Sequence, residues 1–352
     1  MNPTSLQAKA ALVSAADDGY AQKWDAFVNA HPAATSYHRW NWKRVIQKSF
    51  GWRTYYLAAE QDGRITGILP LVWQKSLLFG NFLTSVPFLN AGGIVAETPE
   101  TAAALLAKAA ALGGELRATH IEFRNRRPSG LGLETKTSKI TVTKELQSNS
   151  EAMLQALDKK VRSDVRKSMQ SGFSAEFGGA EFLADFYEVF AVKMRDLGTP
   201  VYPKKFFRHI LNEFPRDTFI CCVRHEGKTV AASLLIAYRD RIEAHWSASL
   251  PALSKLKPNM FMYWSILCFA GERGYKLFDF GRSTVGSGTH KFKMQWSGRE
   301  EQLYWEYWLP EGSQRPELNP DNPRYRAMVA AWRKLPLLLT KLLGPPIVRR
   351  LP

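Results

Sequence analysis

Residues 54–74 read TYYLAAEQDGRITGILPLVWQ, two apolar segments on either side of an Asp62-Gly63 turn. An Asp-Gly pair between two apolar, strand-like segments is a strong signal for a β-hairpin. Residues 218–238, TFICCVRHEGKTVAASLLIAY, repeat the same plan around Glu226-Gly227. Two copies of one hairpin, about 160 residues apart, predict an internal duplication.

The similarity continues downstream of each hairpin. An Ala-rich helical segment, residues 98–112, precedes the strand-like ATHIEFRN in the first half. A helical segment over residues 258–273 precedes YKLFDFGR in the second half. The pairs Glu122-Phe123 and Asp279-Phe280 occupy like places at the ends of these strands, so the predicted repeat includes a hairpin, a helix and a further strand.

The predicted fold is therefore α/β (α+β), with two duplicated domains that each contain a mixed central sheet. A chain of 352 residues exceeds the size at which a single hydrophobic core usually stops growing, which also favours two domains. We place these domains at residues 1–150 and 151–320, followed by a tail at 321–352.

Residues 325–352 of the tail, YRAMVAAWRKLPLLLTKLLGPPIVRRLP, are rich in leucine, and all their ionised side chains are Lys or Arg. Pro336 and Pro345-Pro346 predict that it is broken into short pieces. A basic amphipathic helical segment of this kind suits the surface of an anionic membrane. The alternative is that residues 337–343 pack on the second domain as a closing helix.

Composition limits the classes of partner. The formal net charge is +16, which favours partners that carry phosphate: nucleic acid, nucleotide-linked sugars or anionic lipid headgroups. Nucleic-acid binding as the main role is disfavoured, because no helix-turn-helix, zinc or RNP-type motif accompanies the charge.

The three cysteines lie in apolar segments without metal-ligand spacing, which predicts buried thiols and no metal site. No apolar run reaches membrane-spanning length, so we expect a cytoplasmic protein with peripheral contact to the inner membrane.

A basic helix is predicted where the two halves meet. In ALDKKVRSDVRKSMQSGF, residues 156–173, the apolar positions Leu157, Val161, Val165 and Met169 recur every four residues and form one face. Arg162 and Arg166 lie among the cations on the remaining surface. These charges either face a cleft between the domains, where ligands commonly bind, or merely solvate the helix.

Residues 278–296, FDFGRSTVGSGTHKFKMQW, combine a Gly-Ser-rich turn with basic and aromatic residues. The stretch lacks the Walker A and Rossmann glycine spacings. It also departs from the coenzyme A loop of GNAT acyltransferases, [QR]xxGx[GA], by one extra residue and by leading into a predicted strand. The alternation in HKFKMQW predicts that strand, with Lys291 and Lys293 on one face. Such a face is either an ordinary solvent-exposed face of a sheet or a site that stabilises an oxyanion or binds a diphosphate.

The motifs of the second half resemble the FemAB family of aminoacyl-transferases, whose two domains are each GNAT-like. The resemblance rests on Asp279-Phe280-Gly281, then Phe292-Lys293, Trp296 and Gly298, and on the preceding helix KPNMFMYWSILCFAGERGY. In the first half SYHRWNWKRVIQKSFGW, and at the junction KKVRSDVRKSMQSGF, are similar to further family elements. DLGTPVYP, HWSAS, FGRST and GTHKFKMQW resemble the subgroup associated with exosortase and PEP-CTERM loci, which implies a Gram-negative envelope or exopolysaccharide setting.

The resemblance implies roles for particular residues. Lys293 corresponds to a lysine at the family's reaction centre, where it would stabilise an oxyanion or the leaving group. Arg162 would bind substrate phosphate, and Lys43 and Arg44 would make a second phosphate contact. Further candidate substrate-binding residues are Arg166, Tyr202, Trp246, Arg282 and Lys291. Candidate bases are Asp279, Glu243, His245 and His290.

The implied activity is transfer of an activated acyl or aminoacyl group to an amine of a peptidoglycan- or exopolysaccharide-linked envelope precursor. The expected co-substrate is aminoacyl-tRNA, acyl-coenzyme A or acyl carrier protein, with no bound cofactor. The long coiled-coil arm that some family members use for tRNA contact is missing, which weakens the case for tRNA. One alternative is a GNAT N-acyltransferase that uses acyl-coenzyme A or acyl carrier protein. Another is a non-enzymatic adaptor for anionic lipid or polysaccharide precursors.

Overall fold

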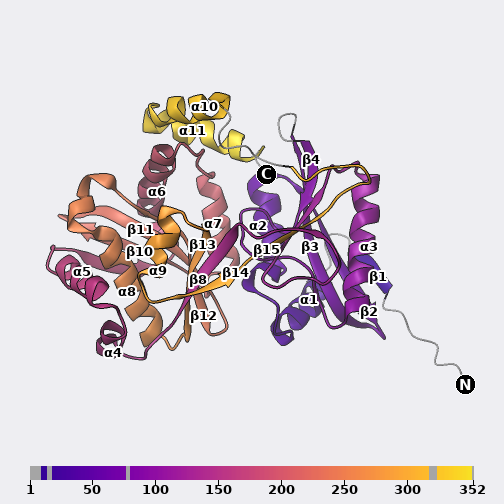
Figure 1. Ribbon diagram of the computed structural model, residues 1–352, viewed down its shortest axis with the longest axis horizontal. Helices are drawn as coiled ribbons and strands as arrows, with labels where there is room; N and C mark the ends of the chain where they lie inside the picture. The colour runs from indigo at the N-terminus through magenta and orange to yellow at the C-terminus, as the bar shows by residue number, and fades with distance from the viewer. Residues whose placement is uncertain (1–8, 14–17, 77–79, 317–322, 351–352) are drawn as a thin grey trace, which may run out of the picture. The chain divides into compact units, whose positions relative to one another are not determined.

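The structure, a computed structural model, describes residues 9–13, 18–76, 80–316 and 323–350 (Figure 1). The chain divides into two compact units. Unit 1 comprises Met1–Lys139, Gln302–Glu317 and Arg350–Pro352, and unit 2 comprises Ile140–Glu301 and Leu318–Arg349. Each unit contains one sheet with helices, and the predicted mixed α/β fold is confirmed.

The sheet of unit 1 has the strand order β1-β2-β3-β4-β6-β15-β7, with β5 paired to β3. Its strands are β1 (Lys9–Val13), β2 (Arg53–Gln61), β3 (Arg64–Ser76), β4 (Gly80–Thr84), β5 (Val95–Ala96), β6 (Ile121–Asn125), β7 (Glu134–Lys136) and β15 (Tyr304–Trp308). Its helices are α1 (Asp18–Ala30), α2 (Asn41–Phe50) and α3 (Pro99–Glu115). Helix α3 extends through Gly113 and Gly114, which we expected to end it.

The sheet of unit 2 has the order β14-β8-β13-β12-β11-β10-β9. Its strands are β8 (Lys139–Glu145), β9 (Ser174–Gly178), β10 (Thr218–His225), β11 (Lys228–Tyr238), β12 (Arg241–Ser249), β13 (Leu277–Thr284) and β14 (Arg299–Gln302). Its helices are α4 (Ser150–Gln155), α5 (Lys159–Met169), α6 (Leu183–Leu197), α7 (Lys204–Glu213), α8 (Pro258–Glu272), α9 (Gly288–Met294), α10 (Pro323–Arg333) and α11 (Leu337–Val348).

Both predicted hairpins are present as antiparallel pairs, β2–β3 and β10–β11. The central turn residues all have positive φ: Asp62 52° and Gly63 77°, and Glu226 50° and Gly227 74°. Positive φ at both positions is the requirement of a type I′ turn, whose twist matches that of the flanking strands. The Asp-Gly and Glu-Gly pairs therefore determine both hairpins locally.

The two sheets correspond strand by strand when the second order is reversed, and each contains one strand from the other half of the sequence. Strand β8 lies between β13 and β14, and β15 lies between β6 and β7. This reciprocal exchange departs from the predicted boundaries at residues 150 and 320. Local hydrophobic pattern identifies a strand but not the sheet it joins, so the sequence contained no signal for the exchange.

Helices cover both faces of the unit 2 sheet. Helices α5 and α8 share one core with the sheet, which includes Val161, Val165, Phe278 and Phe280. Helices α6 and α7 pack on the sheet through other residues. The predicted apolar face of the basic helix is confirmed except at Met169, which is 50% exposed. Ser168 is buried instead, and its hydroxyl donates a hydrogen bond to the Val165 carbonyl oxygen at 2.7 Å.

The predicted strand HKFKMQW is wrong, because most of this segment forms α9. Ser287 caps the helix by accepting a hydrogen bond from the backbone N–H of His290. Phe292 and Trp296 are four residues apart, a spacing that fits a helix as well as a strand, and both pack into the unit 2 core. The two lysines consequently do not share a strand face: Lys293 is buried and Lys291 is exposed.

The C-terminal segment forms α10 and α11, which both pack on α6 within unit 2 (Figure 1). Pro336 precedes α11 as predicted, but Pro345-Pro346 lie inside this helix and do not end it. In the described parts of the chain, no helix combines the length and apolar character required to cross a membrane.

Candidate active site

The candidate site of unit 2 begins where two parallel strands stop pairing. Strands β12 and β13 pair from Arg241↔Leu277 to Glu243↔Asp279. Beyond this point β12 continues for six residues and β13 for five, without further register pairs. Two parallel strands that separate in mid-sheet leave backbone groups of both strands available to a ligand.

A β-bulge lies next to this separation. On strand β11, Leu234 pairs with Trp246 and Leu235 pairs with Ala244, so His245 is the extra residue of β12. Ala244 consequently belongs to the core on the α8 face, whereas Trp246 packs on Phe206 and Phe207 of α7. A bulge that changes the direction of side chains is a frequent feature beside active sites.

Asp279 is fully buried at the last register pair of β13. Its Oδ1 accepts hydrogen bonds from the Thr141 hydroxyl and, at 2.9 Å, from the backbone N–H of Gly281. Its Oδ2 accepts from Arg241 Nη1 at 3.0 Å. A carboxylate that is satisfied in this way orders the strand ends, and these contacts favour a positioning role over the predicted role as a base.

Lys293 of α9 reaches the backbone of β13. Its side chain is 8% exposed, and Nζ donates to the carbonyl oxygens of Gly281 at 2.7 Å and Arg282 at 2.9 Å. An ammonium group has three N–H donors. Within the described residues only these two carbonyls accept from Nζ, so one donor remains for a substrate oxygen.

Burial lowers the pKa of Lys293 to about 8, although the charges of Asp279 and Glu243 oppose this effect and Arg282 adds to it. The charges of these three side chains therefore act on the ammonium group. A lysine with this pKa is mostly protonated at neutral pH but loses its proton about 2.5 pH units earlier than an ordinary lysine. Perturbed lysines of this kind are concentrated at functional sites.

Glu243 and His245 form a pair on β12. His245 Nδ1 lies 3.0 Å from Glu243 Oε1, and the two side chains are 4% and 6% exposed respectively. A carboxylate that accepts from Nδ1–H leaves the ring lone pair on Nε2, the arrangement that a general base requires.

An aromatic cluster adjoins this pair. The Trp246 ring lies 4.0 Å from the His245 ring and 6.4 Å from that of Tyr202, measured between centroids. Tyr202 lies in the turn between α6 and α7, and its carbonyl accepts a hydrogen bond from Tyr187 at 2.8 Å. The predicted substrate residues Tyr202 and Trp246 are thus brought together with the Glu243–His245 pair.

His290, Lys291 and Arg282 have different surroundings. His290 Nδ1 accepts from the backbone N–H of Gly286, and Nε2 lies 2.8 Å from Glu300, so both ring nitrogens are engaged at the end of the loop. Lys291 is exposed on α9. Arg282 is half-buried on β13, and its charge acts on Lys293. His290 therefore has the contacts of a structural residue, whereas Arg282 adjoins the site.

The predicted phosphate-binding residues occur in two groups. Arg162 and Arg166 lie on α5 of unit 2, where Arg162 donates to Gln155 and Arg166 is exposed. In unit 1, Lys43 is 4% exposed with Nζ 4.5 Å from the Trp40 ring centroid, and burial lowers its pKa. Arg44 is half-buried and donates to Asn41 at 2.7 Å. The phosphate contacts stay predictions, as does the cleft between the domains.

Sequence reasoning missed three supporting residues: Thr141 and Arg241, which hold Asp279, and Ser283. Ser283 Oγ is buried and has no hydrogen-bond partner among the residues that the structure describes. A buried hydroxyl without a protein partner is a candidate donor to a ligand. Only the FGRST motif pointed to this position. No group of His, Cys, Asp and Glu in the described ranges could hold a metal ion.

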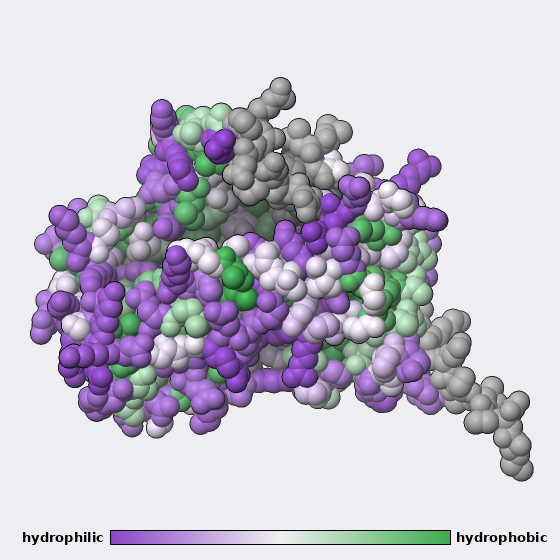
Figure 2. All heavy atoms as spheres, in the orientation of Figure 1, coloured by the Kyte–Doolittle hydropathy of each residue, from purple (hydrophilic) through white to green (hydrophobic). Residues whose placement is uncertain are grey.

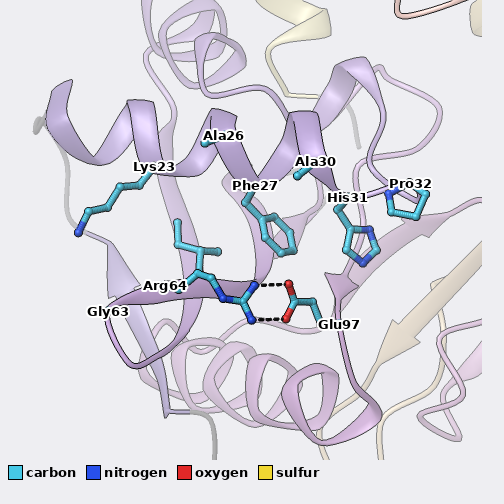
Figure 3. Close-up of a pocket in the computed structure, with 10 residues that line it drawn as sticks. Lys23, Ala26, Phe27, Ala30, His31, Pro32, Gly63, Arg64 and Glu97 are labelled. Carbon is cyan, nitrogen blue, oxygen red and sulfur yellow. Dashed lines mark hydrogen bonds and ion pairs between the residues drawn. The ribbon is translucent and has the colours of Figure 1, made fainter.

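A separate hollow of about 500 Å³ lies in unit 1, between α1 and the β2–β3 turn (Figure 3). Its lining includes Lys23, Phe27 and His31, and Arg64 and Glu97 form a two-bonded ion pair at 2.5 and 2.8 Å. The hollow contains none of the predicted site residues. The charges of Arg64 and Glu97 balance each other, so the hollow offers no unbalanced charge for catalysis. We therefore take the site of unit 2 as the candidate reaction centre.

Comparisons with known proteins agree with this location. Residues 159–294, from α5 to α9, match the acetyltransferase (GNAT) domain family. The structure is similar to that of FemX, with a TM-score of 0.65, 17% identity, and coverage of 84% of this chain and 96% of FemX. No protein in the curated collection matches significantly.

Two other solved structures have the same fold. One is the C-terminal domain of a protein assigned as a lysylphosphatidylglycerol synthetase from Agrobacterium fabrum, with a TM-score of 0.56, 12% identity and coverage of 83% and 92%. The other is a tandem GNAT protein from the clavulanic acid biosynthesis pathway, with a TM-score of 0.54, 11% identity and coverage of 88% and 99%. The predicted tandem GNAT-like fold is confirmed, and the chain has the fold of a GNAT-type acyltransferase.

Proposed function

We propose that this protein transfers an activated acyl or aminoacyl group to an amine of a peptidoglycan- or exopolysaccharide-linked cell-envelope precursor. The observation that carries the proposal is the buried Lys293 ammonium group, held against β13 where β12 and β13 stop pairing. This position lies within the segment that matches a GNAT acyltransferase domain.

The chemistry needs no covalent enzyme intermediate. The acceptor amine attacks the carbonyl carbon of an ester or thioester, the carbonyl oxygen becomes negative, and the donor's oxygen or sulfur departs. The remaining N–H donor of Lys293 stabilises that negative oxygen, an interaction typically worth about 3 kcal/mol. His245, oriented by Glu243, accepts the proton that the amine loses.

The donor class is an aminoacyl-tRNA, acyl-coenzyme A or an acyl carrier protein. One similar structure is named for lysylphosphatidylglycerol synthesis, and another, the tandem GNAT protein, is described as solved without acetyl-coenzyme A. One sequence argument against coenzyme A no longer applies, because the RSTVGSG loop leads into helix α9 and not into a strand. Both donor classes therefore belong in the same assay.

The alternative of a non-enzymatic adaptor is less well supported. An adaptor for anionic precursors needs exposed cations but has no need for a buried one. Placing a lysine in a site that lowers its pKa to about 8 destabilises the charged form, and an adaptor would gain nothing in return.

The decisive experiment supplies purified protein with charged tRNA, acyl-coenzyme A and acyl carrier protein in turn, beside lipid-linked and UDP-linked envelope precursors. Acceptor mass is followed by mass spectrometry. We expect a mass gain with one donor that falls at least about 100-fold in Lys293→Ala. The matched control is Lys228→Ala, which removes an exposed lysine at the β10–β11 turn of unit 2, outside the predicted site, and leaves turnover unchanged. No gain with any donor, together with intact precursor binding, would favour the adaptor.

A further inference from the structure

Helix α11 shows an inverted amphipathic pattern. Its buried positions are Thr340, Gly344 and Val348, spaced by four residues. Its leucines point outward: Leu338 is 78% exposed and Leu342 is 70% exposed. The hydrophobic effect normally turns such leucines inward and leaves threonine and lysine on the surface.

The contacts of the buried face prevent the helix from rotating. A Cβ atom on Gly344 would lie 2.8 Å from the backbone N and 2.9 Å from the O of Val201, so only glycine allows this approach. Lys341 of α11 forms an ion pair with Glu188 of α6. Small and charged residues thus hold α11 on unit 2 with its leucines outward.

The exposed apolar surface is continuous along the outer side of α11. Leu339 and Leu343 are 43% and 45% exposed and lie beside Leu338 and Leu342 on a helical projection, and Met328 of α10 is 70% exposed. Figure 2 shows green apolar atoms, with purple hydrophilic ones beside them, where α10 and α11 lie. Apolar surface that gathers in this way and is rimmed by polar groups marks an interaction site.

The charge of this region identifies the occupant. Lys334 precedes α11, Arg349 and Arg350 follow it, and all three are exposed. From residue 323 to the C-terminus the chain contains no Asp or Glu. A projecting helix face with leucines between basic residues is complementary to an anionic lipid leaflet, because the cations meet the headgroups while the leucines enter the acyl boundary.

We propose that the outer face of α11, with Met328 of α10, is a docking surface for an anionic membrane. The helix lies flat in the interface and does not span the bilayer, since α11 has only 12 residues. The packing of Gly344 on Val201 connects the docked helix to the turn that carries Tyr202 and leads to Trp246. Docking would therefore hold the aromatic side of the candidate site close to the lipid surface.

The test measures partition of the full-length protein onto vesicles by flotation. Phosphatidylcholine vesicles are compared with vesicles that also contain phosphatidylglycerol. We expect binding only to the anionic vesicles, and a loss of about tenfold or more in the Leu338→Ser/Leu342→Ser variant. Because both side chains are exposed, an unchanged melting temperature will show that the variant is folded.

Two matched variants separate the parts of the proposal. Met169→Ser changes another half-exposed apolar side chain of unit 2 and leaves binding unchanged. Arg349→Gln/Arg350→Gln weakens the preference for anionic over neutral vesicles. Equal binding by wild type and the leucine variant would overturn the proposal. A wild-type dimer that the leucine variant abolishes, without vesicle binding, would also overturn it and assign the face to a second copy. Neither result bears on acyl transfer, which is assayed separately.

Discussion

The same point in the two sheets, where a pair of parallel strands stops pairing, is built in two different ways. In unit 1, β4 and β6 pair through Leu83↔Ile121 and Thr84↔Glu122, and in unit 2 the pairing of β12 and β13 ends at Glu243↔Asp279. Each last pair includes a buried or nearly buried acid from the second strand, Glu122 or Asp279. The acid is therefore a shared feature of the duplicated fold.

The surroundings of the two acids differ. Glu122 accepts from Arg124 Nε at 2.7 Å and from the Tyr307 hydroxyl at 2.6 Å, and Tyr307 belongs to the exchanged strand β15. Burial would raise the pKa of Glu122, but Arg124 and Tyr307 together hold it below its ordinary value. Arg124 also donates to the Leu89 carbonyl at 2.9 Å and stacks on Trp305. At this junction the charge of Glu122 is balanced by Arg124, and both side chains are held by hydrogen bonds.

The junction in unit 2 instead adjoins a buried lysine with a lowered pKa and a histidine on a bulge. The comparison indicates that the acid at the strand end is structural in both units. The candidate reactive groups Lys293 and His245 come instead from α9 and from the bulge of β12. Unit 1 is expected to contribute stability or binding, and unit 2 the chemistry.

The largest expected effect concerns the ion pair between Glu122 and Arg124 in unit 1. Arg124→Met leaves the Glu122 carboxylate nearly buried without its cation, which should cost about 3–5 kcal/mol of unfolding free energy. Chemical denaturation measures this loss, with the exposed Arg127→Met as control. A loss no larger than that of the control would contradict the conclusion that Arg124 balances the Glu122 charge.

In unit 2, Lys293→Met should instead increase the free energy of unfolding. A pKa lowered from 10.5 to about 8 means that folding disfavours charged Lys293 by up to about 3 kcal/mol. The full cost applies below pH 8 and disappears as pH rises towards 10.5, because only the unfolded chain is then protonated at this lysine. The variant should therefore be inactive but more stable at pH 7, and denaturation at pH 7 and 10 measures the difference. A variant whose stability relative to wild type is independent of pH would refute this reading of the site.

Gly281→Ala tests the backbone at the strand separation. Gly281 has a φ of 74°, and an added Cβ would lie 2.9 Å from the carbonyl oxygen of Ala244, so we expect a loss of about 2 kcal/mol. Gly286→Ala is the matched control, because its φ is 76° but nothing lies within 4 Å of the added Cβ. Equal losses in the two variants, measured by thermal denaturation, would show that close approach to β12 has no importance.

The smallest effect concerns pH and activity. If charged Lys293 stabilises the oxyanion, kcat/KM should fall about tenfold from its plateau by pH 9, because the pKa of Lys293 is about 8. The assay uses an acceptor amine that is uncharged throughout this range. A rate that rises through pH 8 would instead make Lys293 a base.

Some elements were predictable because their signals are local. The hairpins follow from Asp62-Gly63 and Glu226-Gly227, and helix α8 and strand β13 appear close to the expected residues. The segment around Lys293 was predicted as a strand, because Phe292, Met294 and Trp296 alternate with polar residues. Phe292 and Trp296 alone fit a helix equally well, and the cap at Ser287 was not recognised. The resemblance singled out Lys293 as a residue of the reaction centre, and this role stays a prediction.

By itself the sequence determined the duplicated α/β plan, both hairpin turns and the cationic leucine-rich C-terminus, because turn chemistry, hydrophobic period and charge are properties of neighbouring residues. Only the tertiary structure decided that β8 and β15 exchange sheets and that His245 lies on a bulge beside Glu243. It also decided that Lys293 is buried beside Asp279 and that α11 turns its leucines outward. These features depend on pairing and packing between residues far apart in the chain. Local sequence patterns are compatible with several such arrangements, and the free energy of the whole fold selects one of them.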